Sequence, residues 1–310
     1  MPRTIVVPLD RSEVAERALP IAQALARQLD ARVMLLSVFE IPPEYAVWAG
    51  RHEQDERWIQ RRQDIETYLN GIASQLEPLD VSTSIPTGMD PAIEVHEAVT
   101  ELEDAILVIS TQGRSGIKRL ILGSKASRFV QLATYPVVVV PADCEEYPSA
   151  FSRILLPLDG STFAEHALDI TLELFAGEGR ASPSFHLLRV VDQIYVGNEL
   201  DGDLRNELVN AANQYLNDVA DRLTRRGSQV SWDVEESYEV ANKIVSVAHI
   251  EGVDLISLAT HGRTGFSRFF LGSVADAVLR TATKPVLIVR PTRDVVERAP
   301  ESSRSLRDRS

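Results

Sequence analysis

Residues 5–10 read Ile-Val-Val-Pro-Leu-Asp, and residues 154–159 repeat the pattern as Ile-Leu-Leu-Pro-Leu-Asp, 149 positions later. Three further segment pairs keep this displacement: Gly-Arg-Ser-Gly at 113–116 with Gly-Arg-Thr-Gly at 262–265, Leu-Gly-Ser at 122–124 with 271–273, and the apolar runs at 135–140 and 284–289. The period is far longer than the roughly 20 to 50 residues of solenoid repeats. The chain is therefore predicted to be one domain written twice in tandem.

Each copy alternates short β-branched runs with longer stretches of helical period, which is typical of βαβ units and a mostly parallel sheet. Strands are expected near residues 4–9, 32–38, 80–85, 105–110 and 136–140, and again near 153–158, 184–190, 229–235, 254–259 and 285–290. Helices are expected over 13–29, 56–76, 92–102 and 124–133 of the first copy. The predicted fold class is α/β, with two doubly wound five-stranded domains.

The boundaries follow from the segments that lack these patterns. Residues 142–152 form a short linker that contains Pro148 and two adjacent acids, so we expect domains over 1–144 and 151–294. Residues 295–310 are rich in Arg, Asp, Glu and Ser with little apolar content, which predicts a disordered tail.

Composition excludes several classes of protein. Forty-five acidic against 32 basic residues give a net charge of −13, which repels nucleic acids and anionic membrane surfaces. Cys144 is the only cysteine, so an intrachain disulfide and a thiolate metal site are ruled out, and the six scattered histidines do not suggest a metal cluster. No signal peptide and no apolar run of ~20 residues is apparent, so we expect a soluble, cytoplasmic protein.

A glycine-containing loop follows the fourth strand of each copy. It carries Gly113, Arg114 and Gly116, matched by Gly262, Arg263 and Gly265, and ends in Gly-Ser at 123–124 and 272–273 before a helix. Glycine permits close approach of a ligand to the backbone, and the free N–H groups at a helix start attract anions such as phosphate. The alternative is a plain turn followed by a serine helix cap.

An aspartate ends the first strand of each copy. Asp10 follows Pro8-Leu9, and Asp159 follows Pro157-Leu158. In a doubly wound sheet, ligands bind in the crevice beyond the carboxyl ends of the strands, where such a carboxylate would reach a ribose hydroxyl. Capping of the next helix explains the aspartates equally well and is compatible with ligand contact.

Together these features resemble the universal stress protein family in its tandem form. ATP-binding members carry Gly-x2-Gly-x9-Gly-(Ser/Thr) after the fourth strand, and the spacing here is the same, with Ser110 and Ala259 in place of the first glycine. The resemblance covers about residues 3–142 and 152–291. It implies a sheet ordered 3-2-1-4-5, of the adenine nucleotide α-hydrolase-like type, with an ATP site in each domain. Whether Mg²⁺ accompanies the ATP is left open.

The resemblance also implies residue roles and assembly. Adenine would lie near Val38 and Val190 and the first-strand aspartates, and the ribose and phosphates would lie over the glycine loops. The complete expected set is Pro8, Asp10, Val38, Gly113, Arg114, Gly116, Gly123, Ser124 and Lys125, with Pro157, Asp159, Val190, Gly262, Arg263, Gly265, Gly272, Ser273 and Val274. Pairing through the fifth strands would join the halves as an internal pseudo-dimer, and a homodimer of the tandem chain is also open.

Three functions stay open on the sequence. The leading one is a nucleotide-binding regulatory protein with at most slow hydrolysis, because no catalytic Ser-His-Asp or Cys-His arrangement is evident. An adenylating enzyme would be expected to carry a Ser-Gly-Gly-type loop after strand one, where residues 10–13 read Asp-Arg-Ser-Glu. An interaction module with vestigial sites is the third. The copies also differ, since Thr-Gly-Met-Asp-Pro at 87–91 has no equivalent in Ser-Tyr-Glu at 237–239, so equal occupancy is not assumed.

Overall fold

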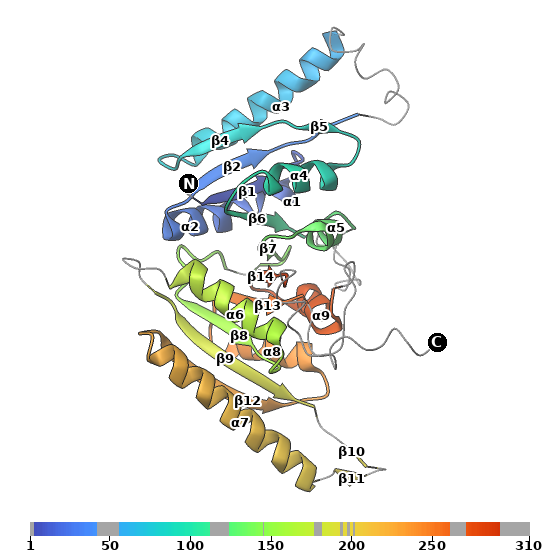
Figure 1. Ribbon diagram of the computed structural model, residues 1–310. Helices are drawn as coiled ribbons and strands as arrows, with labels where there is room; N and C mark the ends of the chain where they lie inside the picture. Colours follow the sequence, from blue (N-terminus) through green and yellow to red (C-terminus); the bar gives the residue numbers. More distant parts are fainter. Residues whose placement is uncertain are drawn as a thin grey trace. The chain divides into compact units, whose positions relative to one another are not determined.

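The computed structural model of the protein describes residues 3–41, 56–111, 124–144, 146–176, 182–192, 195–196, 199–200, 202–260 and 271–291. These residues form two compact units. The first contains residues 3–41, 56–111, 124–142 and 147–150, and the second contains residues 143–144, 146 and the described residues from Phe151 onward. Each unit has its own strands and helices (Figure 1).

The first unit is built on a parallel sheet in the order β4-β2-β1-β6-β7. Its strands are β1 (Thr4–Pro8), β2 (Arg32–Leu36), β4 (Val81–Ser84), β6 (Ala105–Ser110) and β7 (Val137–Val140). Its helices are α1 (Glu13–Glu16), α2 (Leu19–Leu29), α3 (Glu56–Gln75), α4 (Pro91–Thr100) and α5 (Ser124–Leu132). Counted along the chain, these five strands have the order 3-2-1-4-5 that the family resemblance implies.

The chain runs outward from β1 to β4 and then back across to β6 and β7, so right-handed connections put helices on both faces of the sheet. Helices α2 and α3 pack on β1, β2 and β4, whereas α4 and α5 pack against each other. Strands β6 and β7 are buried along nearly their whole length, because residues 105–109 of β6 and all four valines of β7 are buried. Continuous apolar strands of this kind are the expected signature of a covered parallel sheet.

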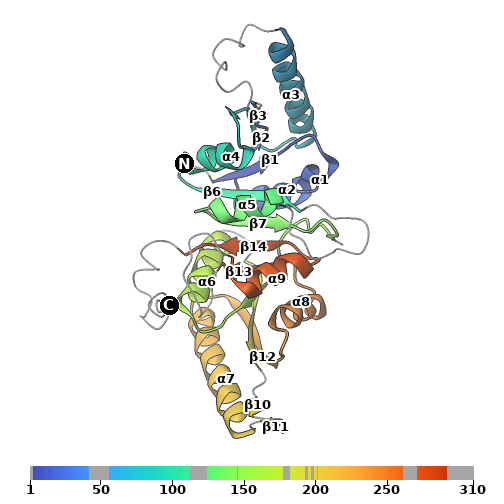
Figure 2. The ribbon, with the colours of Figure 1, turned by 90° about the vertical axis from the view of Figure 1, so that its right-hand side faces the viewer.

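The second unit repeats the arrangement with the sheet order β12-β9-β8-β13-β14 (Figure 1). Figure 2 shows β12, β13 and β14 of this unit from another side. Its strands are β8 (Arg153–Pro157), β9 (Ser184–Val191), β12 (Gln229–Glu236), β13 (Leu255–Ala259) and β14 (Val286–Val289). Its helices are α6 (Thr162–Phe175), α7 (Gly202–Thr224), α8 (Val240–Ile250) and α9 (Ser273–Thr281). The predicted α/β class with two parallel five-stranded domains is confirmed.

The prediction of one helix over residues 13–29 is wrong, because the structure divides this segment into α1 and α2. The break precedes Pro20, which lies in the first turn of α2. Proline has no N–H to donate to the carbonyl four residues earlier, and its ring clashes with that carbonyl, so an interior proline kinks or breaks a helix. The second copy has Asp169 at this position, and α6 runs unbroken from Thr162 to Phe175.

Two pairs of short strands were not predicted. In the first unit, β3 (Phe39–Glu40) pairs in parallel with β5 (Thr87–Gly88), beyond the ends of β2 and β4. Pro86 interrupts the edge strand there because it lacks the N–H that a ladder needs. The second copy has Glu235 instead, and β9 and β12 pair without interruption over eight residues each. The other pair is the antiparallel β10 (Tyr195–Val196) and β11 (Glu199–Leu200).

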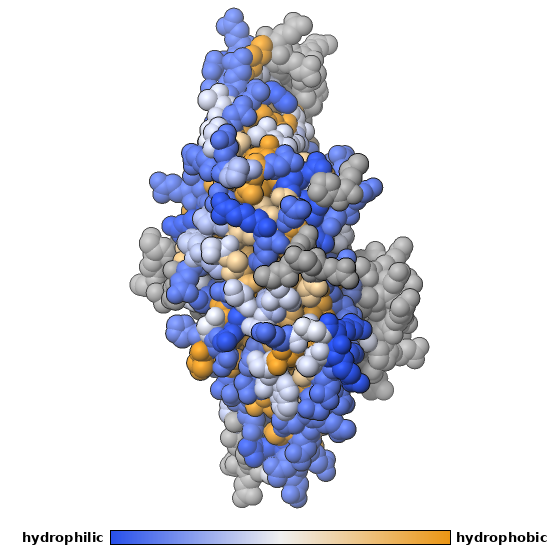
Figure 3. Space-filling view, turned by 90° about the vertical axis from the view of Figure 1, so that its left-hand side faces the viewer, coloured by the Kyte–Doolittle hydropathy of each residue, from blue (hydrophilic) through white to orange (hydrophobic). Residues whose placement is uncertain are grey.

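Hydrophilic residues predominate on the face drawn in Figure 3, and hydrophobic ones are interspersed among them. Within the described ranges, no helix combines the length and apolar character that crossing a bilayer requires. The predicted tail at 295–310 lies outside the described residues, and the proposed domain limits at 144, 151 and 294 stay predictions.

Candidate functional site

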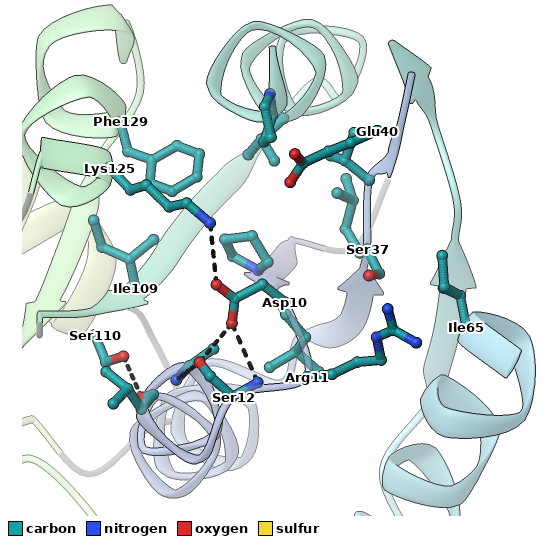
Figure 4. Close-up of a pocket in the computed structure, with 18 of the residues that line it drawn as sticks. Asp10, Arg11, Ser12, Ser37, Glu40, Ile65, Ile109, Ser110, Lys125 and Phe129 are labelled. Carbon is teal, nitrogen blue, oxygen red and sulfur yellow. Dashed lines mark hydrogen bonds and ion pairs between the residues drawn. The ribbon is translucent and has the colours of Figure 1, made fainter. Parts of the chain in front are cut away.

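In the first unit a cavity of about 230 Å³ opens at the carboxyl ends of β1 and β2, beside the start of α5. Four of the predicted site residues line it: Pro8 and Asp10 from the end of β1, Val38 after β2, and Lys125 in the first turn of α5 (Figure 4). They meet because the carboxyl ends of parallel strands and the starts of the following helices share one edge of the sheet. Positions more than a hundred residues apart thus share one wall.

Asp10 is held by the start of α1. Its Oδ1 accepts hydrogen bonds from Ser12 N at 3.2 Å and Ser12 Oγ at 2.5 Å, while Ser12 Oγ accepts from Ala15 N as the helix cap. Burial raises the pKa of Asp10, but the hydrogen bonds from Ser12 and Lys125 outweigh it and leave the pKa below its ordinary value. The carboxylate is therefore ionised at neutral pH and accepts hydrogen bonds only.

Lys125 reaches across the cavity to Asp10. Its Nζ lies 3.2 Å from Asp10 Oδ2, and both side chains remain partly exposed, at 60% and 43%. Figure 4 shows the lysine stem beside Phe129, with its ammonium directed at the carboxylate. An exposed ion pair of this kind contributes at most about 1 kcal/mol, so it can open readily.

Other wall residues were missed by sequence reasoning. Glu40 from β3 and Arg61 from α3 line the cavity, and the Arg61 guanidinium lies 5.3 Å from the centroid of the Phe39 ring. The apolar period of α3 predicts which face packs on the sheet, but not which charged residue sits at its exposed margin. The signal available in the sequence was only the position of Glu40 just past the second strand.

The second unit has a cavity of about 560 Å³ at the equivalent edge. Six of the predicted residues line it, namely Pro157, Asp159, Val190, Gly272, Ser273 and Val274. Gly272 N donates to Thr260 O at 2.7 Å, which holds the start of α9 against the end of β13. Each copy thus brings its first-strand aspartate and its post-loop helix to one cavity.

Both aspartates also accept hydrogen bonds at the start of the helix that follows them. Asp159 Oδ1 accepts from Ser161 N at 2.9 Å, and Ser161 caps α6 through Ala164 N, as Ser12 caps α1. The expectation that the aspartates cap these helices is therefore wrong, because Ser12 and Ser161 are the N-caps of α1 and α6. Each aspartate instead accepts a hydrogen bond from the N–H of the capping serine and lines the cavity wall. The intervening residue takes a left-handed conformation in both copies, with φ of 65° at Arg11 and 77° at Gly160.

Comparison with known proteins also divides the chain into its two copies. The sequence model of the universal stress protein family matches residues 1–141 and again 150–290. The chain belongs to the universal stress protein family. The resemblance drawn from the motifs is thereby confirmed, and the family accounts for the fold of both units.

Relatives of this universal stress protein span one or both of its copies. A universal stress protein of Mycobacterium bovis is 24% identical over 94% of this chain and 96% of its own length. One of Mycolicibacterium smegmatis is 27% identical over 60% of this chain and 62% of its own length, so the match leaves out more than a third of that relative. The crystal structure of one from Archaeoglobus fulgidus, at 18% identity, matches 94% of this chain and 97% of its own with a TM-score of 0.64, which supports the fold.

Part of the family motif lies outside the described residues. This applies to Gly113, Arg114, Gly116, Gly123, Gly262, Arg263 and Gly265, whereas Ser124 begins α5. Ser110 and Ala259, which replace the first glycine, line the two cavities. Ser110 Oγ donates to Val14 O on α1, so this hydroxyl is engaged within the protein.

The turn after the third strand differs between the copies in its capping. Asp90 caps α4 by accepting from Ala92 N at 3.0 Å, and its Oδ2 lies 2.5 Å from Arg128 of α5. The equivalent Glu239 makes no side-chain cap bond with the described part of α8. The longer glutamate side chain is a poor helix cap, whereas aspartate is among the preferred ones. The predicted asymmetry is thus present in this turn.

One cluster outside both cavities was not foreseen. The Nδ1 atom of His186, on β9, lies 2.9 Å from Ser231 Oγ, at hydrogen-bond distance. Its Nε2 atom lies 3.3 Å from Asp233 Oδ2 but makes no hydrogen bond of acceptable geometry. Burial lowers the pKa of His186, although Glu251 and Asp233 act in the opposite direction. None of the three residues lines the described cavities, so the cluster is a structural pairing between two strands. Within the described ranges, no group of His, Cys, Asp or Glu is arranged to hold a metal.

Proposed function

We propose that each unit of this universal stress protein binds an adenine nucleotide, with ATP as the ligand, and that occupancy regulates the protein. The observation that carries the proposal is the convergence of the same three chain segments on a cavity in both copies. They are the ends of the first and second strands and the start of the helix after the glycine loop. A turn that only connected two elements would not require these three segments to meet at a cavity in both copies.

The chemistry of the walls fits a nucleotide. An ionised Asp10 is an acceptor for ribose hydroxyls, and backbone N–H groups at the starts of α5 and α9 suit phosphate oxygens. Apolar side chains such as Ile109 and Phe129 in one cavity and Leu188 and Leu258 in the other would contact the base. Mg²⁺ would be held mainly by the phosphates, as is usual for nucleotide-bound magnesium.

The walls also argue for binding without rapid turnover. Neither cavity has a histidine or cysteine among the described residues that line it. Ser12 and Ser161 cap helices, so they are engaged in structure rather than paired with a general base. A regulatory role is therefore favoured over an adenylating enzyme. Pairing of the two domains through their fifth strands, which the family resemblance implies, is part of the same proposal.

The test is isothermal titration of the full chain with ATP, with and without Mg²⁺, for the wild type and for Gly123→Val and Gly272→Val singly. We expect two sites per chain in the wild type and one in each variant, because a valine side chain would block the approach of phosphate to the backbone. Gly272→Ala is the matched small control, and circular dichroism checks the folding of each variant.

Other outcomes would contradict the proposal. Unchanged affinity in both valine variants would refute the site assignment. Absence of ATP binding by the wild type would favour an interaction module with vestigial sites. Rapid multiple-turnover consumption of ATP with a co-substrate would favour the adenylating enzyme instead.

A further inference from the structure

The two cavities differ in charge at one equivalent position. Lys125 and Val274 each follow the Gly-Ser pair that begins the helix after the glycine loop, and each lines the cavity of its own unit. In the first unit, the Lys125 ammonium lies 3.2 Å from Asp10 Oδ2. Valine cannot form such an ion pair, so this contact exists in only one copy.

The Lys125–Asp10 pair spans the space between the helix start and the first-strand carboxylate (Figure 4). A ligand that uses Asp10 as a hydrogen-bond acceptor must therefore compete with the lysine. Because both side chains are partly exposed, breaking the pair changes an equilibrium constant by no more than about five-fold. Breaking the Lys125–Asp10 ion pair therefore costs little binding free energy, and the charge of the ligand decides whether that cost is offset.

A phosphate group offers Lys125 a replacement partner. Lysine binds phosphate as a point charge, and charge-assisted hydrogen bonds are stronger than neutral ones. A nucleotide that occupies Asp10 with its ribose and reaches the start of α5 with its phosphates would move the ammonium from one anion to another. A nucleoside without phosphate would leave the ammonium with no such replacement partner.

The second unit carries its cationic side chain elsewhere. Arg189 of β9 lines that cavity, and its Nη1 donates to Leu158 O at 3.2 Å. It stands where the first copy has Ser37, at the end of the second strand rather than at the helix start. Its guanidinium donates to the backbone carbonyl of Leu158, next to Asp159, and so comes from another element than Val274.

We propose that Lys125 makes the first site selective for nucleotides over nucleosides, whereas the second site, with Val274, discriminates less by phosphate number. The inference rests on the proposed nucleotide-binding function and specifies the ligand class of one site. Lys125 acts as a specificity-determining residue: it weakens binding of uncharged ligands by holding Asp10, and it strengthens binding of phosphorylated ones.

The experiment measures dissociation constants for adenosine, AMP and ATP by titration calorimetry of the full chain carrying Gly272→Val, which leaves the first site to be observed. Lys125→Met keeps the unbranched shape and most of the length of the side chain and removes its charge. We expect Lys125→Met to weaken ATP binding about ten-fold and to tighten adenosine binding by up to about five-fold. Lys125→Arg, which retains the charge, should keep most of the preference for ATP.

The reciprocal change is Val274→Lys in the chain with an otherwise native second site, where the preference for ATP over adenosine should increase. The Val274→Lys measurement does not need the Gly272→Val variant, so it tests the proposal even if that variant fails to fold. The effect of Lys125 on ATP affinity should decline between 50 and 300 mM salt, because screening weakens exposed charge contacts. These titrations use nucleotides alone and need no partner protein.

The outcomes separate the two proposals. If ATP binds but the ATP-to-adenosine ratio is the same with Lys125 and Met at this position, the inference is wrong and the proposed function stands. If neither the wild type nor any variant binds adenosine, AMP or ATP, the proposed function fails and the inference fails with it.

Discussion

At the scale of single residues, the turn after the first strand uses the same backbone conformation with different side chains in the two copies. Arg11 has a φ of 65°, and Gly160 at the equivalent position has a φ of 77°. A side chain with a Cβ is strained in this left-handed region, whereas glycine adopts it without steric penalty. The first copy therefore keeps an arginine on its cavity wall against the local backbone preference.

We predict that Arg11→Gly stabilises the first unit by about 0.5–1 kcal/mol, because the relief of left-handed strain exceeds the added flexibility of the unfolded chain. Chemical denaturation followed by tryptophan fluorescence would measure it, with Trp232→Phe so that the signal comes from the first copy. The matched control is Gly160→Arg, for which the second unit should lose stability. A loss of stability in Arg11→Gly would contradict this account of the turn.

At the scale of elements, one proline decides whether the helix after the first strand is continuous. The segment is divided into α1 and α2 before Pro20 in the first copy, and α6 runs unbroken through the equivalent Asp169. Asp169 is exposed, so its substitution tests the backbone with little change in packing. Both segments are amphipathic, and the proline is the difference between them that accounts for the break.

We expect Asp169→Pro to destabilise the second unit by about 3 kcal/mol or more, since it removes an interior helical hydrogen bond and introduces a clash. Asp169→Ala separates the loss of the carboxylate from the effect on the backbone and should change stability by less than about 1 kcal/mol. The readout is the denaturation midpoint reported by Trp232, with the two tryptophans of the first copy replaced by phenylalanine. Equal effects of the proline and alanine variants would show that helix continuity is not what stabilises α6.

At the scale of the whole molecule, the two units share a topology but differ in what they bury. His166 and His186 both lie in the second unit, where the first copy carries Arg17 and Met34 at the aligned positions. Burial lowers the pKa of both histidines, against the opposing effect of nearby acids: Asp169 and Glu173 for His166, Glu251 and Asp233 for His186. The folded second unit therefore disfavours protonation of both imidazoles relative to the unfolded chain.

The sign of the resulting pH dependence follows from linkage. Below about pH 6.5 the unfolded chain binds protons at these histidines before the folded state does, so the second unit loses stability as the pH falls from 6.5 toward the lowered pKa values. Above pH 6.5 the two histidines contribute no pH dependence. Denaturation at pH 8.0, 6.5 and 5.5, followed through Trp232, should show this decline.

The double variant His166→Asn and His186→Asn should reduce that decline, because neither position then titrates. Its stability relative to the native chain is compared at each pH, so that a constant loss from altered packing is separated from the slope. An unchanged slope between pH 6.5 and 5.5 would rule out these histidines as its source.

The sequence by itself determined the duplication, the α/β class and the five parallel strands of each copy, because apolar period and β-branched runs are local and survive in both copies. It also placed Asp10 and Asp159 at the strand ends, since a strand's carboxyl end is known once the strand is. It did not predict the short strands β3, β5, β10 and β11. The break of the helix before Pro20 and of the edge strand at Pro86 could have been predicted, because the effect of proline on the backbone is local. The apolar pattern alone does not indicate either break.

Only the tertiary structure decided which side chains meet at the cavities. The contact of Lys125 with Asp10 joins residues 115 positions apart, and Arg61 reaches the same cavity from a third element. Such contacts depend on how helices lie across the sheet edge, which no local pattern encodes. The physical reason is that burial acts residue by residue along a strand or helix, whereas a charge pair requires two separately folded elements to place their side chains within a few ångströms of each other.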